Sequence, residues 1–206
     1  MRVRVTFAKQ GALRYTGHLD LHKIMERSLR RAELPLAYSQ GYHPQPKINL
    51  AAALPLGFAS RAEVMDIWLN EDVENVVAPL QANVPPGLTI LDAAQVDERE
   101  PSLQTQVIAA EYQVEIKEEE HASHLDERVA TVLAADSLPR ERRGKQYDLR
   151  PLIEALTPTP LPLGEGLFMR VTAREGATWL PEEVLYVIGI PLEATRIERT
   201  RLIFID

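Results

Sequence analysis

The sequence predicts an α+β protein made of two ferredoxin-like (βαββαβ) halves packed together, and two observations support this prediction. Stretches in which charged and apolar residues alternate are interspersed with stretches whose apolar residues recur at helical spacing. In the first half their order is β-α-β-β-α-β, and a similar order follows in the second half. A polar, proline-containing segment separates the two. We therefore expect one half over residues 1–97, a linker over 98–107 and a second half over 108–206.

Each element of the first half has a local signal. The runs RVRVTFA and EVMDIWL alternate with period two, as strands with one buried face do. Pro35 and the turn Pro85-Pro86-Gly87 are expected to end the two helices, because proline cannot continue a helix. The expected strands are residues 2–8, 36–39, 46–53, 63–69 and 88–96. The expected helices are residues 18–33 and 73–83.

The second half is assigned in the same way. Residues 140–146 are expected to be extended or to form an arm, and the Pro/Gly-rich residues 157–166 are expected to be a loop. The expected strands are residues 110–116, 167–174 and 195–205. The expected helices are residues 122–135 and 181–188, the latter with proline at a permitted first-turn position.

Residues 14–56 concentrate the side chains that could hold a charged ligand. They include three of the five histidines, His18, His22 and His43. At about 100° per residue, the basic side chains of the predicted helix fall on or near one side, opposite its apolar stripe. These basic side chains are Lys23, Arg27, Arg30 and Arg31. The loop QGYHPQPK follows, and its two prolines stiffen it. A stiff loop beside a cationic helix can hold an anion in place.

The charge is unevenly distributed along the chain. The net charge is −7, yet residues 1–47 hold nine Lys/Arg against three acidic residues. A phosphate backbone responds to the local potential within a Debye length of roughly 8–10 Å, so an acidic protein with a basic face remains compatible with RNA. The alternative is that the basic helix face is simply solvated.

Composition excludes several classes of site. The chain has no cysteine, which rules out disulfides, iron–sulfur clusters and thiolate zinc sites within it. No signal peptide is recognisable and no window approaches 18 apolar residues. We expect a cytoplasmic protein that needs no cofactor and no membrane.

His18 is the one candidate for catalysis. With Asp20 it could form a general base and its orienting carboxylate, but residues i and i+2 diverge on a helix. A capping or packing role for His18 is the alternative. A metal site built from His18, His22 and His43 would lack a carboxylate and a tight spacing, so we expect no metal site.

The ligand-binding candidates combine cations and aromatic rings. Arginine offers a bidentate fork to phosphate, and tyrosine can stack on unpaired bases. Alternatively, Tyr38 and one arginine are partly buried and paired with Glu33 or Glu63. The candidate ligand- or RNA-binding residues are His18, Arg27, Arg30, Arg31, Tyr38, Gln40, Tyr42, His43 and Lys47.

Several motifs resemble one known family. The run HLDL at residues 18–21, the loop SQGYHPQPK at 39–47, LPLG at 54–57 and KQYDLRPLI at 145–153 resemble the radical SAM-linked family. This is a domain of unknown function fused to, or encoded beside, radical SAM proteins with a cobalamin-binding region. Its genes often lie near those of an E/G-type ribonuclease and of ribosomal proteins. The resemblance thus implies such a radical SAM protein as partner, and RNA or a ribosomal component as a second one.

The chain departs from this family at a few positions. Gly17 stands where the family usually has serine, and Tyr42-His43 stands where it usually has Phe-Asn. Without cysteines the chain cannot be the radical enzyme itself. We expect a non-catalytic accessory module that binds an RNA or ribonucleoprotein substrate for a separate radical SAM enzyme.

Two alternatives remain. The paired ferredoxin-like halves and the early histidine are also similar to CRISPR-repeat endoribonucleases, which cleave RNA without a metal. The glycine-rich loop of those enzymes is not evident here. A pure protein–protein adaptor is the third reading.

Overall fold

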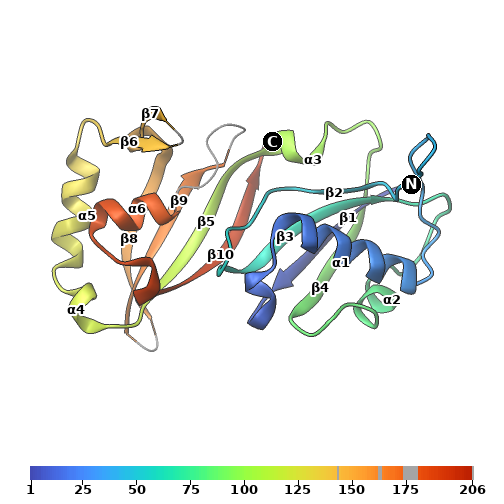
Figure 1. Ribbon diagram of the computed structural model, residues 1–206, viewed down its shortest axis with the longest axis horizontal. Helices are drawn as coiled ribbons and strands as arrows, with labels where there is room; N and C mark the ends of the chain where they lie inside the picture. Colours follow the sequence, from blue (N-terminus) through green and yellow to red (C-terminus); the bar gives the residue numbers. More distant parts are fainter. Residues whose placement is uncertain (143, 162–163, 174–180, 206) are drawn as a thin grey trace. The chain divides into compact units, whose positions relative to one another are not determined.

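The computed structural model describes residues 1–142, 144–161, 164–173 and 181–205. The chain forms two compact units, unit 1 (Met1–Val107) and unit 2 (Ile108–Asp206), and each combines strands with helices (Figure 1). The predicted α+β class is therefore confirmed. None of the described helices is long and apolar enough to cross a membrane.

Unit 1 contains an antiparallel sheet in the order β4-β1-β3-β2. Its strands are β1 (Arg2–Lys9), β2 (Ile48–Leu50), β3 (Ala59–Trp68) and β4 (Leu88–Val96). Its helices are α1 (His18–Arg31), α2 (Val77–Gln81), α3 (Leu103–Gln106) and the 3-10 turn η1 (Gly11–Tyr15). The sequence of β1, α1, β2, β3, α2 and β4 along the chain is the order that the hydrophobic pattern predicted.

The core of unit 1 lies between one face of this sheet and the helices α1 and α2. Because side chains alternate along a strand, one set of positions in β1 and β3 faces the helices. These positions are occupied by Val3, Val5, Phe7, Met65 and Ile67, all buried. Leu21, Met25 and Leu29 of α1 and Leu80 of α2 complete the same cluster. The helical faces opposite these residues are left to solvent.

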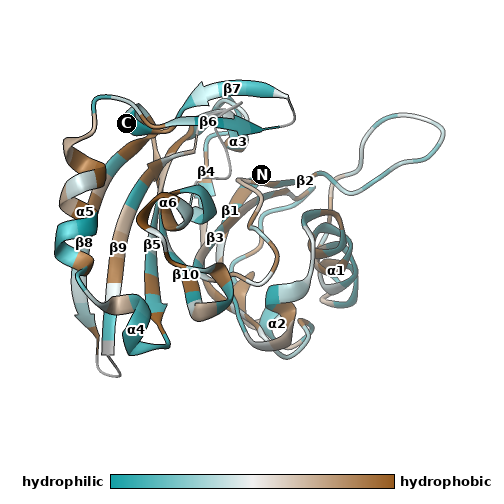
Figure 2. Ribbon diagram, turned by 60° about the vertical axis from the view of Figure 1, so that its left-hand side comes forward, coloured by the Kyte–Doolittle hydropathy of each residue, from teal (hydrophilic) through white to brown (hydrophobic). Residues whose placement is uncertain are grey.

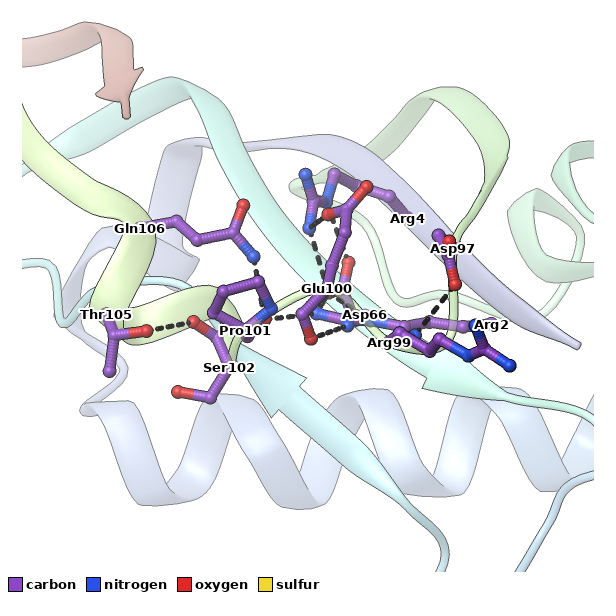
Figure 3. A network of polar contacts seen from close by, with 10 residues as sticks. All are labelled: Arg2, Arg4, Asp66, Asp97, Arg99, Glu100, Pro101, Ser102, Thr105 and Gln106. Carbon is purple, nitrogen blue, oxygen red and sulfur yellow. Dashed lines mark hydrogen bonds and ion pairs between the residues drawn. The ribbon is translucent and has the colours of Figure 1, made fainter. Parts of the chain in front are cut away.

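The other face of the same sheet carries a buried ionic network, drawn in Figure 3. Arg2 donates to Asp66 Oδ2 from both Nε and Nη2, at 2.9 and 2.5 Å, and Arg4 Nε donates to Asp66 Oδ1 at 2.9 Å. Arg2 also donates to the carbonyl oxygens of Glu100 and Pro101, at 2.7 and 3.0 Å. Residues 98–107, expected as a linker, thus belong to unit 1, and these bonds fasten them to its sheet.

Unit 2 contains strands in the order β10-β5-β9-β8, with a separate hairpin of β6 and β7. Its sheet strands are β5 (Val107–Ile116), β8 (Ile153–Leu161), β9 (Gly164–Thr172) and β10 (Thr195–Phe204). The hairpin strands are β6 (Pro139–Arg142) and β7 (Lys145–Asp148). Its helices are α4 (Glu119–Ala122), α5 (Leu125–Ala134) and α6 (Pro181–Ile188), with 3-10 turns η2 (Arg150–Leu152) and η3 (Leu192–Ala194).

The segment KQYDLRPLI ties three elements of unit 2 together. Asp148 Oδ1 accepts hydrogen bonds from the backbone N–H groups of Leu138 and Arg150, at 2.8 and 2.9 Å. These two bonds hold the pKa of the Asp148 carboxyl below its ordinary value. The Arg150 side chain donates to the Leu133 carbonyl at the end of α5, at 2.9 and 3.2 Å. This motif therefore has a structural role in positioning α5, β6 and η2.

Some boundaries differ from the expectations. Of residues 157–166, expected as a loop, residues 157–161 belong to β8 and residues 164–166 to β9, while 162–163 lie outside the described residues. Strand β8 tolerates Pro158 and Pro160 because it is the last strand in the order. Residues 36–39 form only isolated bridges, Leu36 with Leu69 and Tyr38 with Pro46. The helix expected over 73–83 is reduced to α2. Arg174, the expected end of a strand, lies outside the described residues.

Candidate functional site

The exposed side of α1 carries the basic side chains that the periodicity placed together. Helical geometry puts them within an arc of roughly 100°, opposite the buried Leu21, Met25 and Leu29. These side chains belong to Lys23, Arg27, Arg30 and Arg31, and all four are exposed. The predicted basic face is thus present on the surface of unit 1.

Two of these arginines have guanidinium groups without a partner among the described residues. Within the part of the chain that the structure describes, neither Arg27 nor Arg31 has a hydrogen-bond or ion-pair partner. Lys23 lies 4.0 Å from Asp20, both well exposed, and such a pair is weak in water. Arg27 and Arg31 are one helical turn apart, so their forks can reach successive anionic groups of one ligand.

Arg30 is oriented by two neighbours. Its Nη1 donates to the Tyr38 hydroxyl at 2.8 Å, and its Cζ lies 5.2 Å from the centroid of the Tyr38 ring. Its Nη2 lies 3.0 Å from Glu26 Oε1, one turn earlier on α1. Arg30 is therefore partly neutralised, and its two contacts with Tyr38 orient that ring against α1. The expected alternative paired Tyr38 and one arginine with Glu33 or Glu63, whereas Tyr38 contacts Arg30 and Arg30 pairs with Glu26.

The loop after Tyr38, residues 39–45, is closed at its base. Ser39 N donates to the Gln45 carbonyl at 2.8 Å, and Gln45 N donates to Ser39 Oγ at 3.0 Å. Gly41 has a φ of 140°, a value that a residue with a side chain rarely adopts. The loop leading into β2 projects from the unit in Figure 2. Its residues Gln40, Tyr42 and His43 are all exposed.

Lys47 is separated from the arginines of α1. In β2, Ile48 and Leu50 pack toward α1, so Asn49 faces the other side of the sheet, and so does Lys47, the residue directly before β2, if the alternation is extended by one position. Consistent with this, the positive charge of Lys47 contributes to lowering the pKa of Glu98, after the larger effect of the Met1 amino group. The structure therefore does not bring this predicted residue to the candidate site.

His18 is also separated from them. It is the first residue of α1, after the N-cap Gly17, and it is half-buried. At about 1.5 Å per residue it lies roughly 18 Å along the helix axis from Arg30, and about 180° around the axis from Arg27. The described residues contain one cluster with metal-ligating geometry, and its members are Glu118, Glu120 and His121, not the three histidines of residues 14–56.

The sequence analysis did not predict that two other cations form internal ion pairs. Arg2 and Arg4 contribute to the positive excess of residues 1–47, yet both bind Asp66 within unit 1. The signal was an aspartate in the middle of the apolar strand EVMDIWL, where an unpaired carboxylate would be unfavourable. Lys9 is likewise buried and donates to the Thr16 carbonyl at 2.8 Å. Fewer of the basic residues in 1–47 are therefore available on the surface than their number in the sequence suggested.

Residues 2–180 match a family model described as an uncharacterized protein conserved in bacteria (DUF2344). No curated protein matches the chain.

Proposed function

Because the chain belongs to the DUF2344 family of uncharacterized bacterial proteins, we propose its function from the geometry of its surface. The exposed side of α1, together with Tyr38 and the loop of residues 39–45 that follows it, forms an RNA-binding surface of a non-catalytic accessory module. We define this RNA-binding surface as Arg27, Arg30, Arg31, Tyr38 and Tyr42.

The observation that carries the proposal is that the exposed guanidinium groups of Arg27 and Arg31 have no partner within the part of the chain that the structure describes. A structural arginine is normally paired with a carboxylate, as Arg2 is with Asp66. Arg27 and Arg31 have no such partner among the described residues, and they share the exposed side of α1 with Arg30, which contacts the Tyr38 ring. Guanidinium groups bind phosphate oxygens through two parallel hydrogen bonds, so a phosphate backbone satisfies both.

The distribution of polar groups favours binding over catalysis at this surface. RNA cleavage needs a general base within hydrogen-bond reach of the attacking hydroxyl. His18 lies at the opposite end of α1 from Arg30. His43 is on the loop and exposed, without a contact to any described carboxylate. We therefore assign no catalytic residue to this surface.

The partner and the fold family are further parts of the proposal. Resemblance to the radical SAM-linked family supports a separate radical SAM protein with a cobalamin-binding region as the enzyme that this module serves. The strand order β4-β1-β3-β2 in unit 1 and β10-β5-β9-β8 in unit 2 supports ferredoxin-like halves, with the β6-β7 hairpin inserted in the second.

The test is charge reversal at the two free arginines. We expect the double variant Arg27→Glu/Arg31→Glu to bind bacterial total RNA at least about tenfold more weakly at low salt, because two phosphate contacts become repulsive. The matched control is Lys145→Glu/Arg201→Glu, which changes the net charge equally at exposed positions outside α1. Filter binding measures the RNA affinity of both double variants. Equal losses in the two variants, or no binding by the natural protein, would refute the proposal.

A further inference from the structure

The aromatic side chains of the RNA-binding surface point to the form of RNA that it takes. From them we infer that the ligand is unpaired RNA, whose bases stack on Tyr42 and Tyr38 while its phosphates bind Arg27 and Arg31. This inference rests on the proposed function and narrows it.

Tyr42 is the first reason. Its side chain is fully exposed, at the tip of a loop whose neighbours Gln40 and His43 are also exposed. An exposed ring has both faces available, and a nucleobase that stacks on it shields apolar surface of both partners. In a duplex the base faces are covered by neighbouring base pairs, so the ring would find only grooves and phosphates.

Tyr38 is the second reason. Its hydroxyl accepts the Arg30 hydrogen bond at 2.8 Å, and the guanidinium of Arg30 lies 5.2 Å from the ring centroid. The ring is therefore held in one orientation before any ligand binds, although about a third of the residue remains exposed. A pre-oriented ring loses little conformational entropy on stacking, which favours binding.

The closed base of the loop is the third reason. The reciprocal bonds between Ser39 and Gln45, and the bond from Lys47 N to the Ala37 carbonyl at 2.9 Å, fix both ends of the loop. Pro44 restricts the backbone between them. Tyr42 therefore lies in a short loop whose two ends are fixed by hydrogen bonds. A binding surface that combines cations with restrained aromatic rings suits single-stranded RNA, because the bases of a flexible single strand can turn outward and stack on the rings.

An acidic protein is the competing occupant. Carboxylates also bind arginine forks, and exposed tyrosines occur in protein interfaces. Charge complementarity alone does not separate the two classes, since both ligands are anionic. The fully exposed Tyr42 favours the nucleic acid, because a base offers a flat apolar face of matching size.

The experiment measures fluorescence anisotropy of a labelled 12-nucleotide RNA of mixed sequence, alone and annealed to its complement. We expect the natural protein to bind the single strand at least about tenfold more tightly than the duplex. Tyr42→Ala is expected to weaken single-strand binding by about five- to one-hundredfold, the effect of losing one stacked base. The matched control is Tyr186→Ala, which removes another exposed tyrosine; the Arg140 Cζ lies 4.1 Å from the centroid of its ring.

The outcomes separate the two proposals. Equal affinity for single strand and duplex would overturn this inference and leave the proposed function standing. No effect of Tyr42→Ala on the single strand would also overturn it. Binding of neither RNA would refute both, and tighter binding of poly-glutamate than of RNA would assign the surface to an acidic protein. Tyr42 is fully exposed, so its removal leaves the core intact, and circular dichroism checks this.

Discussion

Asp66 determines how two arginines of the first strand are used. It is fully buried, and its two carboxylate oxygens accept bonds from both Arg2 and Arg4. Arg4 also reaches Glu100 Oε2 at 3.1 Å, and the hydrogen bond to Asp66 raises the pKa of its guanidinium despite partial burial. A buried carboxylate is tolerated only when it is paired and hydrogen-bonded, which is the arrangement in Figure 3.

Replacing this carboxylate provides the prediction at the scale of residues. We expect Asp66→Asn to lower the free energy of unfolding by about 3–5 kcal/mol, because Arg2 would remain buried without a compensating charge. Urea denaturation followed by Trp68 fluorescence measures it, since the Arg2 guanidinium lies over the Trp68 ring. The control is Asp20→Asn at an exposed ion pair, for which we expect a change below about 1 kcal/mol. Equal effects of the two substitutions would contradict the assigned role of Asp66.

At the scale of elements, α1 is where local sequence and structure agree best. The helix was expected over residues 18–33 and spans His18–Arg31. It ends before Pro35 because Glu33 adopts a φ of 55°, a left-handed conformation that stops the helix. The helix expected over residues 73–83 is far shorter, and Pro79, which has no backbone N–H, lies inside the short α2.

The start of α1 offers a prediction at the same scale. Gly17 is the N-cap and supplies no side-chain cap, while a Cβ there would meet open space. We expect Gly17→Ser to stabilise the first turn by roughly 0.3 kcal/mol, because the serine hydroxyl can accept a hydrogen bond from an uncapped backbone N–H. The hydrogen-exchange rates of the backbone amides of residues 19–21 measure this change in the stability of the first turn.

Gly17→Ala is the control for this substitution. It reduces the freedom of the unfolded chain as serine does, but it cannot cap the helix. Slower exchange in the serine variant alone would therefore report capping. Equal slowing in both variants would instead attribute the effect to the unfolded chain.

At the scale of the whole molecule, the net charge of −7 opposes binding of any polyanion. Binding must then depend on the few cations that are locally concentrated on α1, Lys23, Arg27, Arg30 and Arg31. Two to four phosphate contacts to a single strand predict a slope of log affinity against log salt of about −1.5 to −3. Titrations at a series of salt concentrations measure this slope. A slope near zero would exclude phosphate binding, and a much steeper one would require cations from elsewhere in the chain.

The sequence by itself determined the α+β class, most of the helices and strands, and the basic side of α1. These features follow from the alternation and helical periodicity of neighbouring residues, and such patterns are local. It also indicated the exposed Gly/Pro loop that carries Tyr42, because glycine and proline act on the backbone at their own positions.

Only the tertiary structure decided which cations are available to a ligand. Strand register places Asp66 opposite Arg4, and alternation in β2 sends Lys47 to the face away from α1. Register joins residues that are far apart in sequence, so no local pattern reveals it. The contact of Arg30 with Tyr38, and the lack of partners for Arg27 and Arg31 among the described residues, depend on the same long-range packing.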